Sequence, residues 1–194
     1  MSALIKPELV FTYGDYASWP SEEQWELLEG VPYAMTAPSR QHQLVSFEVG
    51  FQIRSYLSGK SCSIYAAPFD VRLPANNEAD ELIETTVQPD LAVICDAHKL
   101  DDKGCRGAPD WIIEVLSPST ALKDMDIKRR LYERHGVKEY WIIHPTDTWL
   151  MVYTLGASGT YANHPRMYPL TDPVAVGLFP DLAIEWGFLQ DRAG

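Results

Sequence analysis

The order of apolar and polar positions along the chain predicts two helices. Between Ser39 and Leu57, apolar residues recur at the three- and four-residue spacing of one helix face. Ser39 can cap the first turn of this helix, and Gly59 can end it. A second helix is expected from about Thr120 to His135, closed by Gly136.

Short apolar runs between these segments predict strands. Trp25–Leu28 and Val31–Met35 flank Glu29-Gly30, which suits a tight turn, although a short helix from Ser21 competes with this interpretation. The tail from Val174 to Leu189 is expected to form short strands or a closing flap. The remaining expected strands are Ser63–Ala67, Phe69–Leu73, Pro89–Cys95, Asp110–Leu116, Glu139–Ile143 and Trp149–Leu155. This order predicts an α/β chain of the α+β mixed kind, with helices packed on a mixed β-sheet.

Length and composition favour one globular unit. The chain has 194 residues, which predicts a single domain over residues 1–194, with residues 1–20 as an arm lying on it. Hydrophobic residues make up 46% and charged residues 22%, the balance of a globular protein. No apolar run approaches the roughly 18 residues of a membrane span, and the chain start does not resemble a signal peptide. A cytoplasmic location is the default expectation.

The cysteines and the charge change this picture little. Cys62, Cys95 and Cys105 are odd in number and form no C-x-x-C, so neither a disulfide framework nor a zinc site is predicted. Cys95 is expected in the core. The net charge of −11 argues against a surface that binds nucleic acid all over. Positive charge is concentrated between Ala121 and Lys138, and the loop Glu78–Glu84 is acidic, so the helix is expected to face phosphates and the loop to point away.

Two acidic residues interrupt the two most apolar strands. Asp90 begins Pro-Asp-Leu-Ala-Val-Ile, and Glu114 lies within Trp-Ile-Ile-Glu-Val-Leu. A carboxylate among apolar neighbours is costly unless something compensates it, and a divalent cation held between adjacent strands would do so. The alternative is that Glu114 forms a buried ion pair and Asp90 caps a turn, and residue patterns alone weigh the two interpretations equally.

The second helix offers a cation to this pair. Asp124, Lys128, Tyr132 and His135 share one face, and the helix begins just after the Glu114 strand ends. A lysine on this face could reach the site and orient the attacking water. For an isolated helix, an Asp124–Lys128 surface pair of little energetic value is the simpler interpretation.

Two further residues are candidates. Asp70 is another carboxylate among apolar strand residues, and is either a third acidic ligand or a buried structural acceptor. His42 opens the first helix, where a histidine is more often a packing or hydrogen-bonding residue than a ligand.

Several segments together resemble the Uma-two family of predicted bacterial endonucleases, over about residues 10–188. The segments around the acidic strands are Val87-Gln88-Pro89-Asp90-Leu91, Gly107-Ala108-Pro109-Asp110 and Ile113-Glu114-Val115-Leu116-Ser117-Pro118-Ser119-Thr120. The flanking ones are Trp25-Glu26-Leu27-Leu28-Glu29-Gly30, Pro38-Ser39, His42-Gln43, Asp70-Val71-Arg72-Leu73, and then Asp124, Lys128, Tyr132, Gly136-Val137 and Glu139-Tyr140-Trp141.

The resemblance implies the fold and the metal ligands. The family belongs to the PD-(D/E)XK, or restriction-endonuclease-like, superfamily, whose fold is a central mixed β-sheet flanked by helices. Asp90 and Glu114 match its metal carboxylates. The superfamily pattern has Lys two residues after the second carboxylate, where this chain has Leu116. The family displaces this lysine to the next helix, which matches Lys128.

Together these observations predict a Mg²⁺- or Mn²⁺-dependent endonuclease that acts on DNA, and the sequence leaves open whether RNA is also cut. Asp90 and Glu114 would bind the metal with Asp70 as a candidate third ligand, and Lys128 would position or activate the water. His42 and Tyr132 would be supporting residues.

Other interpretations stay open. One is a catalytically inactive nucleic-acid-binding or regulatory module that keeps the nuclease fold, and another is a metal hydrolase for a different phosphate ester. The family also suggests a homodimer, with Trp141 and Trp149 as candidate exposed aromatic residues at its interface.

Overall fold

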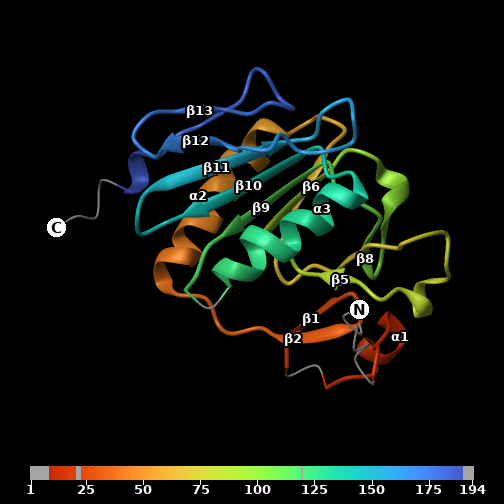
Figure 1. The fold of residues 1–194 in the computed structure, drawn as a ribbon. Helices are drawn as coiled ribbons and strands as arrows, with labels where there is room; N and C mark the ends of the chain where they lie inside the picture. Colours follow the sequence, from red (N-terminus) through yellow and green to blue (C-terminus); the bar gives the residue numbers. More distant parts are fainter. Residues whose placement is uncertain (1–8, 21–22, 119, 190–194) are drawn as a thin grey trace.

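A six-stranded mixed β-sheet forms the centre of the protein, and a helix covers each of its faces (Figure 1). The computed structural model describes residues 9–20, 23–118 and 120–189. Helix α2 (Arg40–Tyr56) packs on one face, and α3 (Arg129–His135) on the other. In spatial order the strands are β12 (Arg166–Pro169), β11 (Trp149–Thr154), β10 (Glu139–His144), β9 (Trp111–Val115), β6 (Leu91–Ile94) and β3 (Ser63–Ala66). The predicted mixed sheet flanked by helices is confirmed.

The alternation of side chains along β9 divides the core into two parts. Ile113 and Val115 face α2 and pack with its buried valines Val45 and Val49. Ile112 points to the opposite face, toward α3. Because successive strand residues point to opposite faces, Glu114 shares the α3 face with Ile112.

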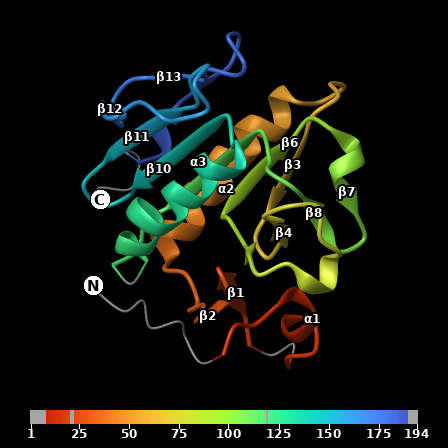
Figure 2. The same cartoon turned by 45° about the vertical axis from the view of Figure 1, so that its right-hand side comes forward.

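A second, smaller sheet lies below the first and carries the N-terminal hairpin (Figure 2). Its strands, in spatial order, are β2 (Val31–Ala34), β1 (Trp25–Leu28), β5 (Thr86–Val87), β4 (Val71–Arg72), β8 (Gly104–Arg106) and β7 (Leu100–Asp101). The short helix α1 (Tyr13–Tyr16) packs beside β1. The other short elements are η1 (Asp80–Leu82), η2 (Ala97–Lys99), β13 (Val174–Ala175), β14 (Ala183–Ile184) and η4 (Gly187–Leu189).

The predicted hairpin and the first helix have the expected local geometry. Glu29 and Gly30 have φ values of 51° and 78°, as the two central residues of a tight hairpin turn require. The side chain of Ser39 accepts a hydrogen bond of 3.2 Å from the backbone N–H of His42, which caps α2. The hairpin and the cap are therefore where the sequence predicts them.

Some expectations need correction or lie outside the described residues. The second helix begins at Ala121 and Leu122, passes through a π-helical segment, η3 (Lys123–Lys128), and continues as α3 to Gly136, which has φ 84°. Trp141, expected on the surface, is fully buried against Trp111, because it lies on the face of the sheet that α2 covers. Residues 1–8 of the predicted arm and Ser21 of the competing helix are not among the described residues. In the part of the chain that is described, no helix is long and apolar enough to cross a membrane.

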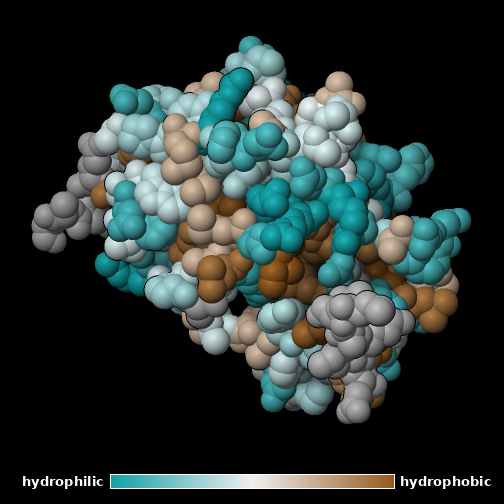
Figure 3. Space-filling model, viewed as in Figure 1, coloured by the Kyte–Doolittle hydropathy of each residue, from teal (hydrophilic) through white to brown (hydrophobic). Residues whose placement is uncertain are grey.

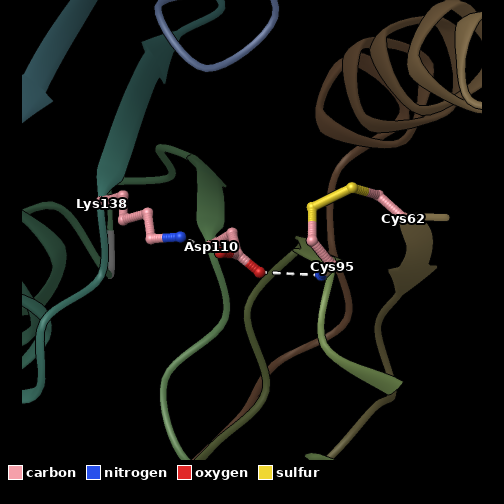
Figure 4. Close-up of a disulfide and its surroundings, with 4 residues drawn as sticks. All are labelled: Cys62, Cys95, Asp110 and Lys138. Atoms are coloured by element: carbon pink, nitrogen blue, oxygen red, sulfur yellow. Dashed lines mark hydrogen bonds and ion pairs between the residues drawn. A yellow bond between two sulfur atoms is a disulfide. The ribbon is translucent and has the colours of Figure 1, made fainter.

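The expectation that the cysteines form no disulfide is wrong. Cys62 and Cys95 are bonded to each other (Figure 4). Cys105 is buried and free. The cause of the Cys62–Cys95 bond is strand register. β3 and β6 pair antiparallel with Ser63 opposite Ile94, so Cys62, just before Ser63, comes to lie opposite Cys95, just after Ile94. Sequence spacing alone does not supply that register.

The bonded strands are also held to the neighbouring strands by one aspartate. Asp110 accepts a hydrogen bond of 2.8 Å from the backbone N–H of Cys95, and Lys138 Nζ lies 2.7 Å from its other oxygen (Figure 4). Burial acts to raise the pKa of Asp110, but these two partners lower it below its ordinary value. The carboxylate thus links the ends of β6, β9 and β10.

We expect one alkylatable thiol in the unfolded protein without reductant, and three after reduction. Mass spectrometry after alkylation counts them. Because the bond closes a loop with a sequence separation of 33, Cys62→Ser should lower the free energy of unfolding by about 3–4 kcal/mol in the absence of reductant. Three reactive thiols before reduction would contradict the pairing.

Candidate active site

The strand register places Asp90 directly opposite Glu114. In the antiparallel pair of β6 and β9, Leu91 lies opposite Ile113, and the next residues outward are the two acids. The backbone N–H of Val115 donates to Asp90 Oδ2 at 2.7 Å, and the backbone N–H of Asp90 lies 3.4 Å from Glu114 Oε2. The structure thus brings together the two carboxylates that the sequence singles out.

Lys128 is buried at the centre of this group. Its Nζ lies 2.8 Å from Glu114 Oε1, 2.5 Å from Glu26 Oε1 and 3.6 Å from Asp124 Oδ1. The Tyr132 hydroxyl donates to the same Glu114 oxygen at 2.9 Å. The side chain of Lys128 is 3% exposed, so the alternative of an Asp124–Lys128 pair on the surface is wrong.

Glu26 is the site residue that the sequence reasoning missed. It lies on β1, is fully buried, and accepts a hydrogen bond of 3.0 Å from the backbone N–H of Gln88. The signal was available: Glu26 stands among Trp25, Leu27 and Leu28, the same pattern of a carboxylate within an apolar strand that marked Glu114. Its side chain brings the smaller sheet into the site.

The π-helical geometry of η3 explains how two lysines reach this one carboxylate. Lys123 Nζ lies 2.6 Å from Glu26 Oε2, while Lys128 Nζ binds Oε1. Residues five apart on an α-helix point about 140° apart. The i→i+5 turn of a π-helix brings them to the same side, and such turns occur frequently at functional sites.

Leu116 occupies the position where the superfamily pattern has lysine. Two residues beyond Glu114, it shares that strand face, and it is buried in the core under α3. Lys128 supplies from the helix the ammonium group that Leu116 cannot supply from the strand. Lys128, and not residue 116, therefore places an ammonium group next to Glu114.

Burial and mutual repulsion perturb the acids of this cluster. Burial raises the pKa of Glu114 to about 8 despite Lys128, and Asp124 and Asp90 add to the rise. Burial also acts to raise the pKa of Glu26, but Lys128 and Lys123 hold it below its ordinary value. For Lys128, burial favours the neutral amine, yet the surrounding carboxylates raise its pKa well above the usual value. The lysine stays charged while Glu114 takes up a proton easily.

His42 lies on the other side of Asp90. Its Nε2 is 3.1 Å from Asp90 Oδ2, and its Nδ1 is 3.5 Å from Ser46 Oγ. Burial acts to lower the pKa of His42, but the hydrogen bond and charge of Asp90 raise it overall. The imidazole can therefore orient the Asp90 carboxylate and, when protonated, compensate its negative charge.

Asp70 and His135 are not part of this cluster. Asp70 Oδ1 accepts hydrogen bonds from the Tyr16 hydroxyl at 2.9 Å and from Gln88 Nε2 at 2.8 Å. Burial and Arg134 lower the pKa of His135, whose other charged neighbours lie away from the site. Asp70 thus has the geometry of a structural acceptor, one of the two interpretations that the sequence allows.

The basic side chains of the second helix are largely paired with acids. Arg129 and Arg130 form ion pairs within the helix, with Glu133 and Asp126. Arg134 reaches Glu29 of the hairpin turn at 2.7 Å. Hydrophilic side chains still cover much of the face around α3, with hydrophobic ones visible between α3 and the N-terminal strands (Figure 3). These pairs reduce the free positive charge that the helix offers to phosphates.

The donor set fits a divalent cation. Among the described residues, no three or more His, Cys, Asp and Glu side chains are grouped so as to hold a metal ion. Nevertheless the cluster opposes four carboxylates, those of Glu26, Asp90, Glu114 and Asp124, with two lysines. Asp124 Oδ1 is buried without a hydrogen-bond partner in the described part of the chain. A further positive charge, in addition to the two lysines, would compensate this excess, and Mg²⁺ and Mn²⁺ prefer oxygen donors.

The mixed sheet with a helix on each face has the restriction-endonuclease-like fold. A crystal structure of a protein from Anabaena variabilis, described as a putative nuclease belonging to DUF820, matches with a TM-score of 0.72 at 18% identity, covering 93% of this chain and 98% of that one. The protein slr1290 of Synechocystis, described as uncharacterized, is 26% identical over 150 residues, 76% of this chain and 75% of that protein. The Uma2 family model, described as "Putative restriction endonuclease", matches residues 13–186, so the chain belongs to the Uma2 family.

We expect Lys128→Met to lower the free energy of unfolding by about 3–5 kcal/mol at pH 8, because it leaves buried carboxylates without their cation. Their pKa values then rise in the folded state. The variant therefore keeps its stability below the pKa that these carboxyl groups have in the unfolded chain, and loses it as the pH rises through their pKa in the folded protein. The difference between variant and wild type should thus be smaller at pH 5 than at pH 8. Urea unfolding at both pH values, with a chelator present, measures it.

Lys138→Met is the matched control for this experiment. The side chain of Lys138 is 60% exposed, and its pair with Asp110 lies outside the cluster. We expect a loss of about 1 kcal/mol or less for this variant. Equal losses in the two variants, or a loss that does not vary with pH, would contradict the central role of Lys128.

Proposed function

We propose that this chain is a divalent-metal-dependent endonuclease that hydrolyses phosphodiester bonds of DNA. The observation that carries the proposal is that Lys128 Nζ lies 2.8 Å from Glu114 Oε1. Glu114 itself lies on β9, directly opposite Asp90. Two carboxylates and one ammonium group suit the hydrolysis of a phosphodiester, in which negative charge develops on the phosphate oxygens. Membership of the Uma2 family supports the same class of reaction.

Asp90 and Glu114 are the residues that would hold the metal. Restriction-endonuclease-like nucleases generally use divalent ions, and Mg²⁺ or Mn²⁺ suits these oxygen donors. When bound, such an ion acts as a Lewis acid that makes water a better nucleophile and compensates charge on the phosphate. The raised pKa of Glu114 means that this acid would give up its proton on binding the cation.

Lys128 and Tyr132 act around the reacting atoms from the α3 side. The Lys128 ammonium stays charged, so it can orient the attacking water or stabilise negative charge on the phosphate. The Tyr132 hydroxyl donates to the same Glu114 oxygen as Lys128 and fixes that side chain. In this assignment Tyr132 is a positioning residue.

His42 and Glu26 orient the groups that touch the substrate. His42 holds Asp90 Oδ2, and the backbone N–H of Val115 holds the same oxygen. Glu26 holds Lys128 and Lys123 together, which keeps the Lys128 ammonium directed toward Glu114. Such partners of ligands usually affect metal affinity or activity about 10–100-fold when removed.

A second candidate is a module that binds nucleic acid without cutting it. The observation in its favour is that Lys128 is engaged by three acidic side chains. In that case Lys128 would serve the stability of the fold, and binding would persist without hydrolysis.

We expect Asp90→Asn to abolish the rise in melting temperature that Mn²⁺ gives the wild-type protein. The same variant should lower kcat/KM for DNA cleavage at least about a thousandfold, since a bound cation contributes several kcal/mol to transition-state stabilisation. Differential scanning fluorimetry and a gel assay with supercoiled DNA measure the two effects.

Asp126→Asn is the control, because Asp126 is an exposed acid on the adjacent η3 that pairs with Arg130. It should keep both the metal response and the activity. Cleavage that survives Asp90→Asn would rule out this site. Wild-type protein that binds DNA but cuts no nucleic acid with either metal would favour the binding module.

A further inference from the structure

A pocket lined by aromatic rings lies beside α1 and β1, outside the carboxylate cluster. Its volume is about 290 Å³, and its walls include Tyr16, Trp19, Trp25 and Gln88. Among the described residues that line it there is neither lysine nor arginine, while Glu23 contributes a carboxylate. The pocket therefore suits a neutral planar group better than a phosphate.

The rings of this pocket form an edge-to-face series. Trp19 contacts Tyr16 and Trp25, each with ring centroids 5.7 Å apart and with interplanar angles of 67° and 71°. All three side chains are partly exposed. Trp25 has only this one ring contact among the described residues, so at least one of its faces is not covered by another ring, and every nucleobase has a π-face that can stack on such a face.

Gln88, which lines the pocket, carries a buried hydrogen-bond acceptor without a partner in the described part of the chain. Gln88 is 7% exposed, and its Nε2 donates to Asp70 Oδ1 at 2.8 Å and to the Tyr16 hydroxyl at 3.0 Å. Since an ionised aspartate can only accept, Asp70 fixes which end of the amide is the nitrogen. Gln88 Oε1 is then left buried with no partner in the described part of the chain, which is costly unless a ligand donates to it.

The pocket is next to the carboxylate cluster along the backbone. The backbone N–H of Gln88 donates to Glu26 Oε1, and Gln88 precedes Asp90 by two residues, a span of at most about 7 Å between their Cα atoms. The pocket wall at Pro68 is equally close, because the neighbouring Ala67 N–H donates to the Asp90 carbonyl at 3.1 Å. A nucleic-acid strand whose phosphate lies beside the Asp90 carboxylate therefore has a base within reach of the Trp25 ring.

We propose that this pocket holds an unstacked nucleobase of the substrate strand. A base inside a duplex is stacked and paired, so the pocket can take one only from single-stranded or locally unpaired nucleic acid. The rings supply sequence-tolerant stacking for such a base. This inference rests on the proposed function, and it makes single-stranded or unpaired segments the substrate class.

The test compares two fluorescein-labelled single strands of equal length and equal phosphate number, one with normal bases and one made of abasic residues. Dissociation constants are measured by anisotropy at fixed salt with a chelator present, so that no cleavage occurs. Wild-type protein should bind the normal strand about tenfold more tightly than the abasic one. It should also prefer the normal single strand to the corresponding duplex.

Variants then locate the preference. Trp25→Leu should bring the ratio of the two dissociation constants close to one, and Trp25→Phe, which keeps a ring, should restore most of it. Trp19→Leu repeats the test at a second wall position in case Trp25→Leu does not fold. Tyr168→Leu, a partly exposed aromatic position on the edge strand β12, should leave the ratio unchanged.

The outcomes separate this inference from the proposed function. Equal affinity of wild-type protein for the two strands would overturn it, as would a preference that survives both tryptophan-to-leucine changes. A preference that depends on Trp25 supports the base pocket even if no metal brings about cleavage. In that case the endonuclease proposal fails and the binding module takes its place.

Discussion

The rest of the structure depends on the ion pairs that the buried Lys128 ammonium group forms with the carboxylates around it. This group joins Glu26 of the smaller sheet, Glu114 of the central sheet and Asp124 of its own π-helical segment. Burying a charge is costly, and the arrangement is stable because several carboxylates face it at once. Those carboxylates outnumber the lysines that face them. The cluster that fixes the fold at this point therefore also keeps an excess of carboxylates, which is the basis of the proposed cation site.

Both sheets contribute to the same region for a topological reason. The chain leaves the smaller sheet after β5, bends at Asp90, and enters β6 of the central sheet. This short crossing carries a pocket residue, Gln88, and a carboxylate, Asp90, two positions apart. Phosphodiester chemistry and recognition of a base can therefore be served by neighbouring residues, without a separate binding domain.

The sequence allowed most of the elements to be predicted, and part of the site. Ser39, the Glu29–Gly30 turn and the apolar strands gave reliable local signals, because caps, turns and alternation depend on neighbouring residues. Strand register depends on distant segments, so the opposition of Cys62 to Cys95 could not be predicted. The place of Glu26 beside Lys128 could not be predicted either, since it requires the two sheets to meet. The π-helical turn was missed because a standard helical period was assumed for that segment.

Anomalous diffraction from a crystal soaked in Mn²⁺ is the most direct measurement of the metal site. We expect an anomalous peak within coordination distance of carboxylate oxygens of both Asp90 and Glu114, with Lys128 Nζ still beside Glu114. A crystal that takes up manganese elsewhere but shows no peak between these two acids would contradict the account.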